Sequence, residues 1–387
     1  MIERSIKEQI DSRLYKGKAV IVVGPRQVGK TTLLRMLVAD TDRKVLVWNC
    51  DEPDVRKKLN EPTSTELGAE TANVDLILID EAQRVKNIGI TLKLLVDNYP
   101  EKQVVVTGSS AIELSSSINE PLTGRKFEYV MFPFSSEELI REFGATEERR
   151  MLERRLIYGS YPEVVNHPGE ERETLIDLVN SYLYKDIFSF QDVRKPEIVE
   201  QLWQALALQV GCEVSFNELG RLLGLTSITV QRYIDLLEKS YVLFHLRSFS
   251  RNVRSELKKS RKIYFYDNGV RNAILGDYKP LDLRTDTGAL WENYVISERM
   301  KHNSYSAFYG KSYFWRTQQQ QEVDYIEDYD GVLHTYEFKW SKTKQPRLAE
   351  TFTKNYPDHT FAIVSPDNYQ DFVYGKLKSI SILRIIK

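Results

Sequence analysis

A glycine-rich segment near the N-terminus has the residue spacing of a phosphate-binding loop. It runs from Gly24 to Thr32 and matches the pattern G-x-x-x-x-G-K-[ST]. In such a loop backbone N–H groups surround the phosphates, a lysine reaches the β- and γ-phosphates, and a hydroxyl ligates Mg²⁺. The predicted nucleotide contacts here are Gly24, Pro25, Arg26, Gln27, Val28, Gly29, Lys30, Thr31 and Thr32. Lys30 would supply the charge and Thr31 the metal-binding hydroxyl.

Two adjacent carboxylates, Asp80 and Glu81, follow the apolar run Leu76–Ile79. Ligands of open α/β sheets bind at the carboxyl ends of the strands, which is where this pair would lie. We expect Asp80 to hold Mg²⁺ through its water shell and Glu81 to polarise the attacking water. Together with the loop, the pair predicts Mg²⁺-dependent hydrolysis of a nucleotide.

The elements that must position these residues alternate between strand and helix. The run Ala19–Val23 is wholly apolar and β-branched in part, which is typical of a strand buried on both faces. Further strands are predicted at 45–48, 76–79, 104–106 and 127–132. Helical or loop sequence separates them, and this favours an α/β fold with a five-stranded parallel sheet. The charged segment 1–14 predicts a short amphipathic helix.

Three segments carry a resemblance to a known family. GPRQVGKTT, LILIDEAQRV and VVVTGSSA resemble the Walker A, Walker B and sensor 1 segments of AAA-like P-loop ATPases. Nearly the whole chain resembles a bacterial and archaeal ATPase family with a C-terminal domain of unknown function. The resemblance implies ATP and Mg²⁺ as cofactors and Lys30, Asp80 and Glu81 as catalytic residues.

The same resemblance suggests two further residues for the nucleotide site. Thr107, Ser109 or Ser110 would sense the γ-phosphate, and Ser109 is included among the predicted nucleotide contacts. The segment Leu122–Arg125 resembles the family's L-x-G-R segment, which makes Arg125 a candidate arginine finger. The alternative is a structural arginine at a strand entrance. The sequence leaves open whether Arg125 acts in cis or in trans, and with it whether the chain is a homo-oligomer.

Two α-helical regions are predicted after the sheet. Residues 135–192 predict a helical connector or lid, in which Ser135 and Glu138 have capping-box spacing. Residues 214–246 predict a winged helix-turn-helix, with Phe216, Leu219, Leu222 and Leu223 on one face of its first helix. Gln231 and Arg232 would lie on the exposed face of the second, recognition helix. The alternative is a helical hairpin used for packing or oligomer contacts.

A basic run falls where the wing of this motif would be. Residues 241–262 contain the bases Arg247, Arg251, Arg254, Lys258, Lys259, Arg261 and Lys262 and the single acid Glu256, a local charge of 7 − 1 = +6. A basic wing beside a recognition helix is typical of a surface that contacts a phosphate backbone. We therefore predict DNA as a partner; a solvated loop facing an acidic neighbour is the alternative.

The last third has the residue types of a metal-dependent nuclease. A helix at 285–300 carries Glu292, a following strand carries Asp324, and the next strand carries Glu337 and Lys339 as E-x-K. This arrangement resembles the PD-(D/E)xK nuclease superfamily. The resemblance implies a second divalent metal held by Glu292, Asp324 and Glu337, with Lys339 orienting the nucleophile. The alternative is an ion-paired strand surface without a metal.

Length and composition set the limits of the prediction. The chain has 387 residues and a formal net charge of −1, from 54 basic and 55 acidic residues, which excludes strongly disordered and collagenous classes. Its two cysteines give no disulfide framework, no run is apolar enough to span a membrane, and a cytoplasmic location is expected. The predicted units are a P-loop ATPase core (1–134), a connector (135–195), a winged-helix-like domain (196–283) and a restriction-endonuclease-like domain (284–387).

The function predicted from the sequence is an AAA-like ATPase that couples nucleotide state to DNA binding and, through the C-terminal domain, to DNA cleavage. The alternative is a nucleotide-gated switch or signalling scaffold whose C-terminal domain binds a protein partner and lacks nuclease activity. A small-molecule kinase is disfavoured because the Asp-Glu pair suits water activation.

Overall fold

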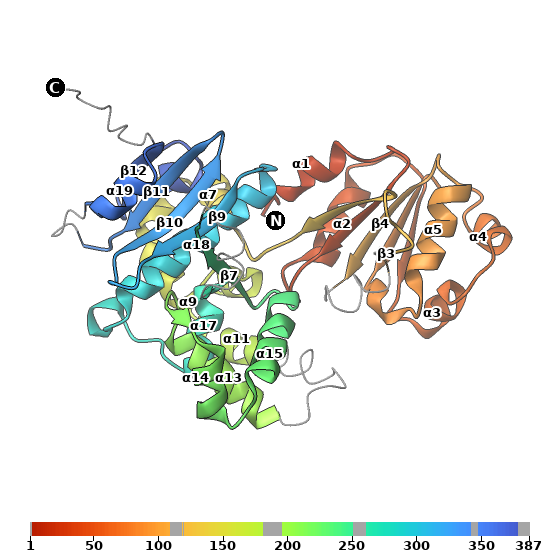
Figure 1. Ribbon diagram of the computed structural model, residues 1–387. Coiled ribbons are helices and arrows are strands. Elements are labelled where there is room, and N and C mark those ends of the chain that lie inside the picture. Colours follow the sequence, from red (N-terminus) through yellow and green to blue (C-terminus); the bar gives the residue numbers. More distant parts are fainter. Residues whose placement is uncertain are drawn as a thin grey trace.

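The computed structural model describes residues 2–108, 118, 120–180, 196–250, 261–341 and 347–377. The chain forms an α/β unit on a five-stranded sheet and a second part on a seven-stranded sheet (Figure 1). Helices α11, α13, α14 and α15 gather beside the second sheet. The helices of the described residues include none that is long and apolar enough to cross a membrane.

The five-stranded sheet has the order β2-β3-β4-β1-β5, and every pairing in it is parallel. Its strands are β1 (Ala19–Val23), β2 (Val45–Asn49), β3 (Leu76–Asp80), β4 (Gln103–Gly108) and β5 (Lys126–Val130). The predicted strand count is confirmed, and each predicted strand overlaps an observed one, although β5 ends at Val130 and not at Phe132. The apolar runs form the central strands because only strands covered on both faces bury every side chain, as β1, β3 and β4 do.

Helices cover both faces of this sheet (Figure 1). They are α2 (Lys30–Ala39), α3 (Pro53–Leu59), α4 (Ser64–Glu70) and α5 (Ile88–Asn98), with the short helix η1 (Ala82–Arg84) after β3. The N-terminal helix α1 (Ile6–Asp11) is amphipathic as predicted, and its Ile6 and Ile10 lie in the core beside β1.

Short helices connect the two parts of the molecule. They are α7 (Ser136–Phe143), α8 (Ala145–Arg150), α9 (Leu152–Tyr158), α10 (Pro162–Asn166) and α11 (Glu171–Leu178). The predicted capping box is present, since the Ser135 side chain accepts from the Glu138 N–H and the Glu138 carboxylate accepts from the Ser135 N–H. Residues 181–195 of the predicted connector lie outside the described residues.

The seven-stranded sheet has the order β12-β11-β10-β9-β7-β8-β6. Its strands are β6 (Glu213–Val214), β7 (Leu243–Ser248), β8 (Arg261–Phe265), β9 (Lys311–Arg316), β10 (Glu322–Tyr329), β11 (Val332–Phe338) and β12 (His359–Val364). Strands β6–β8 come from the segment predicted as a winged helix, and β9–β12 from the segment predicted as nuclease-like. Because β7 pairs in parallel with β9, the predicted boundary between 283 and 284 does not separate two sheets.

The helices of the second part include those of the predicted helix-turn-helix and the predicted helix at 285–300. They are α13 (Pro196–Leu208), α14 (Phe216–Leu223), α15 (Ser227–Lys239), α17 (Asn268–Leu275), η3 (Leu281–Leu283), α18 (Thr287–Tyr305), α19 (Glu350–Asn355) and α20 (Tyr369–Val373). Helix, turn, helix and strand occur in the expected order from α14 to β7. One detail differs, because Leu222 is 68% exposed and does not share the buried face of Leu219.

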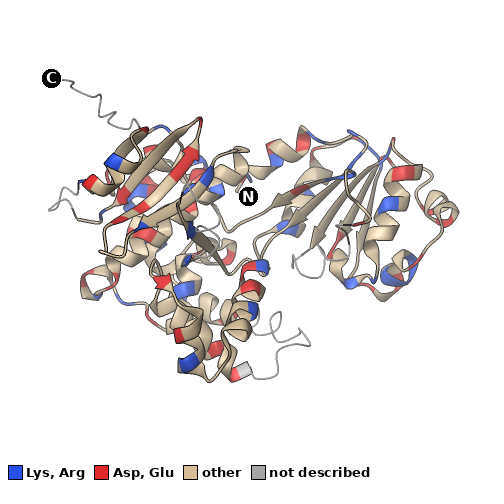
Figure 2. Ribbon diagram, in the orientation of Figure 1, with Lys and Arg blue, Asp and Glu red and all other residues tan. Residues whose placement is uncertain are grey.

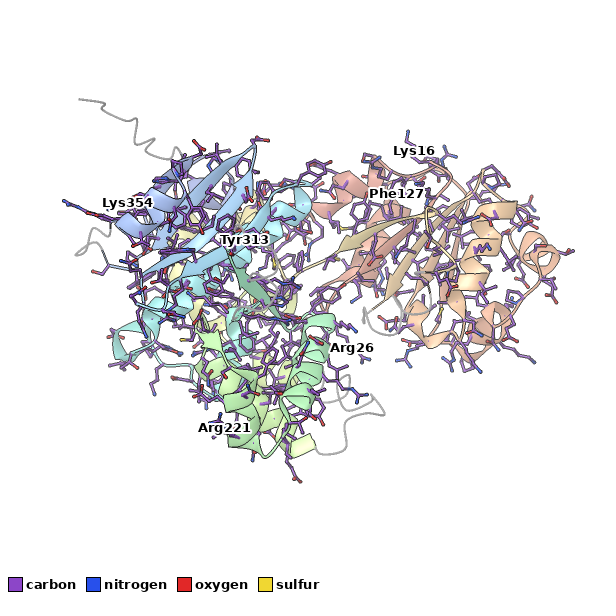
Figure 3. All side chains as sticks on the ribbon, in the orientation of Figure 1. Lys16, Arg26, Phe127, Arg221, Tyr313 and Lys354 are labelled. Atoms are coloured by element: carbon purple, nitrogen blue, oxygen red, sulfur yellow. The ribbon has the colours of Figure 1, made fainter. Side chains whose placement is uncertain are left out.

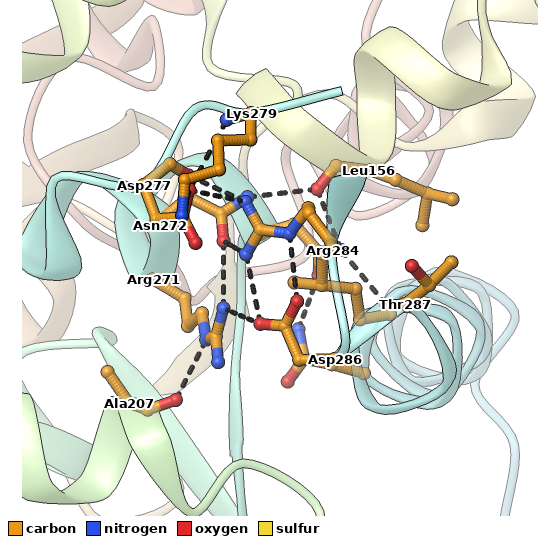
Figure 4. Close-up of polar contacts among 12 residues, drawn as sticks. Leu156, Ala207, Arg271, Asn272, Asp277, Lys279, Arg284, Asp286 and Thr287 are labelled. Carbon is orange, nitrogen blue, oxygen red and sulfur yellow. Dashed lines mark hydrogen bonds and ion pairs between the residues drawn. The ribbon is translucent and has the colours of Figure 1, made fainter. Parts of the chain in front are cut away.

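A buried polar cluster fixes the start of α18 (Figure 4). The Arg271 guanidinium donates to the Ala207 carbonyl of α13 and to Asp286, which precedes α18. Arg284 also donates to Asp286 and to the Asn272 side chain. Asn272 in turn donates to the Leu156 carbonyl of α9. Charge-assisted bonds of this kind set the position of α18 against the connector.

Candidate functional site

The phosphate-binding loop lies between β1 and α2, as the sequence predicts. Gly24 has φ 151°, and a Cβ there would lie 2.1 Å from the Met131 carbonyl oxygen, so a side chain does not fit. Gly29, the N-cap of α2, has φ 94°. Lys30 is buried, and its Nζ donates to the carbonyl oxygens of Gly24 at 2.9 Å and Pro25 at 2.6 Å. The loop's own oxygens therefore hold the ammonium group at the place predicted for the phosphates.

The predicted metal ligands meet at the end of β3. Thr31 Oγ1 donates to Asp80 Oδ2 at 2.7 Å, and Thr107 Oγ1 donates to the other carboxylate oxygen, Oδ1. Thr107 Oγ1 also accepts from the Glu81 N–H at 3.3 Å. A hydroxyl and a carboxylate at this distance suit Mg²⁺, which prefers oxygen ligands, so the residues fit the ion. Of the three sensor candidates, Thr107 touches this pair; Ser109 and Ser110 lie outside the described residues.

Glu81 occupies a special backbone position. Its φ of 53° and ψ of 41° place it in the left-handed region, between β3 and η1. The Gln83 side-chain amide donates to Glu81 Oε2 at 2.6 Å. Left-handed backbone outside glycine is uncommon and is concentrated at functional sites. The turn directs the Glu81 carboxylate into the same cleft as Asp80.

A cleft of about 940 Å³ opens over these residues. One wall comes from the five-stranded unit and includes Arg26, which lies on the side facing the helical part (Figure 3). The opposite wall comes from α10 and α11 and was missed by the sequence analysis. Its residues are Pro162, Glu163, Asn166, Thr174, Asp177 and Leu178. The Gly159–Glu163 turn was the available signal, since it delivers Pro162 and Glu163 to the cleft.

A smaller, mostly apolar pocket of about 280 Å³ adjoins the cleft and shares Gly29, Thr32, Pro162 and Asn166 with it. Its other lining residues are Ile2, Arg4, Val28, Met131, Phe134, Glu142 and Phe143. The N-terminal segment, the phosphate loop and the connector therefore line two neighbouring pockets.

Arg125 is not brought to this cleft. It directly precedes β5, whose Lys126 is in register with Ala19 at the start of β1, and the Arg125 carbonyl accepts from the Ala19 N–H. The phosphate loop follows the opposite end of β1. Arg125 is 40% exposed in its side chain and pairs with Asp97 at 2.5 Å. Within one chain, the sheet separates Arg125 from Lys30.

A buried arginine connects the phosphate loop to the connector. Arg4, 3% exposed, donates to the carbonyl oxygens of Val28 in the loop and Phe132 after β5. Its Nε donates to the buried Glu138 carboxylate at 3.1 Å, in the first turn of α7. Glu138 also accepts from the Ser5 N–H. Arg4 therefore connects the phosphate loop to α7 through two hydrogen bonds.

The C-terminal candidates do come together, but with lysines between them. Lys339 Nζ lies 3.0 Å from Glu337 Oε2 and 3.6 Å from Asp324 Oδ2. Glu292 Oε1 accepts from the Tyr264 hydroxyl at 2.7 Å and from Lys262 Nζ at 3.3 Å. Lys262 also pairs with Glu322. We call the residues Lys262, Tyr264, Glu292, Glu322, Asp324, Glu337 and Lys339 the C-terminal cluster.

Burial shifts the acidities of two carboxyl groups in this cluster. Burial, reinforced by the neighbouring Asp324 charge, raises the pKa of Glu337 to about 7 although Lys339 lowers it. Burial also raises the pKa of Glu292 to about 7, against the opposing effect of Lys262. Both groups therefore change charge near neutral pH.

The predicted second metal set does not fit this geometry. No group of three or more His, Cys, Asp or Glu side chains in the described part of the chain is arranged to hold a metal ion. Asp324 Oδ2 is already bonded to the Phe338 N–H at 2.9 Å and faces Lys339. In this arrangement the carboxylates are paired with Lys262 and Lys339.

Part of the surface predicted to face DNA lies within the described residues. Gln231 and Arg232 are exposed on α15, opposite the buried Val230, Tyr233 and Ile234. Lys262, counted in the basic run, is instead buried in the C-terminal cluster. Arg251, Arg254, Lys258 and Lys259 lie outside the described residues. Basic and acidic residues are interspersed over both parts of the molecule (Figure 2).

Comparison with protein families divides the chain into three segments. Residues 16–140 match an AAA domain. This match supports an AAA-like, nucleotide-binding ATPase. Residues 149–280 match a domain of unknown function (DUF8612), and residues 287–384 match another (DUF4143). The predicted winged-helix and nuclease-like identities of these later segments gain no support from the matches.

Relatives cover most of the chain. An uncharacterized protein of Mycobacterium tuberculosis and one of Mycobacterium bovis are each 27% identical over 375 residues, covering 95% of this chain and 80% of the relative. An uncharacterized protein of Haemophilus influenzae is 26% identical over 209 residues, covering 51% of this chain and 52% of the relative.

Solved structures give weaker matches. The structure of Drosophila ORC bound to AT-rich DNA and Cdc6 has a TM-score of 0.26 at 12% identity, covering 71% of this chain and 93% of that chain. Bacteroides Pif1 bound to ssDNA has a TM-score of 0.25 at 15% identity, covering 46% and 50%. Similarity this low carries no argument about this chain.

Proposed function

We propose that this protein is a Mg²⁺-dependent ATPase whose nucleotide lies in the cleft between the five-stranded unit and helices α10 and α11. The observation that carries the proposal is the convergence of Lys30, Thr31, Asp80 and Thr107 beneath that cleft. Lys30 would exchange its bonds to the loop carbonyls for bonds to the β- and γ-phosphates. Thr31 and Asp80 would hold Mg²⁺, which supplies charge stabilisation to the transferring phosphoryl group.

Glu81 would orient the attacking water. Its backbone is in the left-handed region, its carboxylate accepts from Gln83, and the residue lines the cleft. The base would occupy the adjoining apolar pocket, where Phe143 and Met131 offer apolar contact. This places the triphosphate over the loop and the nucleoside toward the N-terminal segment.

Steady-state ATP hydrolysis with Mg²⁺ tests the proposal. Lys30→Ala should abolish turnover and weaken ATP binding, whereas Glu81→Gln should abolish turnover and leave ATP binding intact. Turnover that is undiminished in either variant would contradict the assignment. Lys93→Ala on α5, outside the cleft, is the matched control and should leave turnover unchanged.

Arg125 enters the proposal only across a subunit boundary. Because the sheet separates it from Lys30 in one chain, an arginine finger at this position requires a second copy. Mixing Lys30→Ala with Arg125→Ala protein tests this idea: a homo-oligomer with a finger in trans restores turnover, and failure to restore any turnover contradicts it.

Coupling to DNA is the second element of the proposal. It is supported by the exposed Gln231 and Arg232 on α15 and by the sequence of the adjoining basic run. Fluorescence anisotropy at low salt should show binding of duplex DNA that weakens on Arg232→Glu. Lys354→Glu is the control, since Lys354 lies on α19, away from α15 (Figure 3). An equal loss of DNA affinity in both variants would show that the effect comes from the change in net charge alone.

We do not propose DNA cleavage, because the C-terminal cluster as arranged does not fit a metal ion. This favours a role in which the C-terminal part responds to nucleotide state or binds a partner without cutting DNA. DNA-stimulated ATP hydrolysis would support coupling to DNA. Nucleotide-dependent binding of a protein partner, without DNA affinity, would instead support the switch or scaffold.

A further inference from the structure

The C-terminal cluster contains a cation of its own. Lys262 is 2% exposed, and its ammonium group lies between the carboxylates of Glu292 and Glu322. It is the second residue of β8, in the segment that precedes the E-x-K strand by many residues. Lys262 therefore belongs to a strand that was not part of the predicted metal site.

The partners of Lys262 are held in place by further contacts. Tyr264, on the same strand, donates to the same Glu292 oxygen at 2.7 Å. Gly211 packs close to the Glu292 carboxylate, since a Cβ at Gly211 would lie 3.3 Å from Glu292 Oε1. Glu322 is also 3.8 Å from Arg316. The carboxylates on this side of the cluster thus face lysine, arginine and tyrosine donors.

We propose that Lys262 is a built-in counter-ion that closes the C-terminal cluster to divalent cations in the conformation described. An ammonium ion and a divalent metal compete for the same carboxylate oxygens. A metal also needs several oxygens at about 2.0–2.6 Å. In the described arrangement Lys262 pairs with Glu292 and Glu322, and Lys339 pairs with Asp324 and Glu337. A divalent ion placed here would in addition face a buried like charge, which is costly in a poorly solvated site. Removing the Lys262 charge should therefore open a cation site.

Direct measurement of Mn²⁺ binding, by electron paramagnetic resonance without nucleotide, tests this inference. All proteins carry Asp80→Asn, which removes the carboxylate ligand of the nucleotide site, so that this site does not contribute. The parent protein, with Lys262 in place, should show no Mn²⁺ binding that Asp324→Asn removes. Lys262→Met should bind about one Mn²⁺ per chain, and adding Asp324→Asn should remove it. Lys301→Met, which removes another buried lysine paired with Glu298, is the matched control and should gain none.

Two outcomes would overturn the inference. One is Mn²⁺ binding by the parent that Asp324→Asn abolishes, since the cluster would then be open with Lys262 in place. The other is a folded Lys262→Met protein, verified by circular dichroism and melting, that binds no Mn²⁺. If Lys262→Met does not fold, Lys262→Gln keeps a hydrogen-bonding group without the charge, and the same two outcomes apply. The readout requires no ATPase activity, so the proposed function can fail independently.

Discussion

Thr107 lies at the end of β4 and contacts both residues of the Asp80-Glu81 pair. Its hydroxyl donates to the Asp80 carboxylate and accepts from the Glu81 N–H, so one side chain contacts both predicted catalytic residues. In the C-terminal cluster, burial raises the pKa of Glu337.

Thr107→Val should lower kcat for ATP hydrolysis by about 10²-fold with a smaller change in KM, because misplacing Asp80 and Glu81 affects the reaction more than binding. Steady-state kinetics measures this split. Thr91→Val is the matched control, since Thr91 is buried and donates to the Leu59 carbonyl away from the cleft. A kcat loss of equal size in both variants would assign the effect to general destabilisation.

Glu337 should make the folded protein less stable as pH rises. Its pKa of about 7 lies above the ordinary 4.5, so between pH 4.5 and pH 7 the folded state binds more protons than the unfolded state. The stabilising effect of its bound proton is full below the unfolded pKa and is lost as pH rises through 7. Melting curves at pH 5.5 and 8 should therefore show a larger loss for the natural protein than for Glu337→Gln. An equal loss would exclude Glu337 as the source.

At the scale of elements, the phosphate loop and the connector are joined through Arg4. This residue precedes α1, yet it bonds the loop, the end of β5 and the first turn of α7. Helix α18 approaches the same turn from the other side, where Glu298 accepts from the Ser136 N–H and Lys301 donates to the Phe134 carbonyl. The N-terminus of α7 is therefore the junction between the two sheets.

Arg4→Met should lower the free energy of unfolding by about 3–5 kcal/mol, because it leaves the Glu138 carboxylate buried without its partner. Chemical denaturation measures the loss. Lys7→Met is the control: Lys7 pairs with the more exposed Asp11 and Asp40, and its loss should cost less than about 1 kcal/mol. Similar losses in the two variants would show that the Arg4 contacts carry no special weight.

At the scale of the molecule, the cleft has one wall from each side of the α7 junction. A ligand that contacts both walls should stabilise the whole chain in proportion to its affinity, by about 2.7 kcal/mol at a hundredfold excess over Kd. A nonhydrolysable ATP analogue with Mg²⁺ should therefore raise the melting temperature. Asn166→Ala, on α10, should reduce this rise, whereas Asn98→Ala, exposed on α5, should not. An unaltered rise in Asn166→Ala would place the nucleotide on the loop wall alone.

The sequence by itself determined the five-stranded sheet and the residues at its carboxyl edge. Apolar runs such as Ala19–Val23 and the spacing from Gly24 to Thr31 are local patterns, and a strand buried on both faces or a phosphate loop is specified by contiguous residues. The order of helix, turn, helix and strand from α14 to β7 was readable for the same reason.

Only the tertiary structure decided which distant residues share a site. It placed α10 and α11 over the phosphate loop, Arg125 at the opposite edge of the sheet, and Lys262 among the C-terminal carboxylates. None of these follows from local pattern, because each depends on how separate elements pack and on which face of a strand meets which neighbour. Lys262 shows the reason most clearly: in the sequence it belongs to a basic run, and in the fold its charge is neutralised by carboxylates 30 and 60 positions further along the chain.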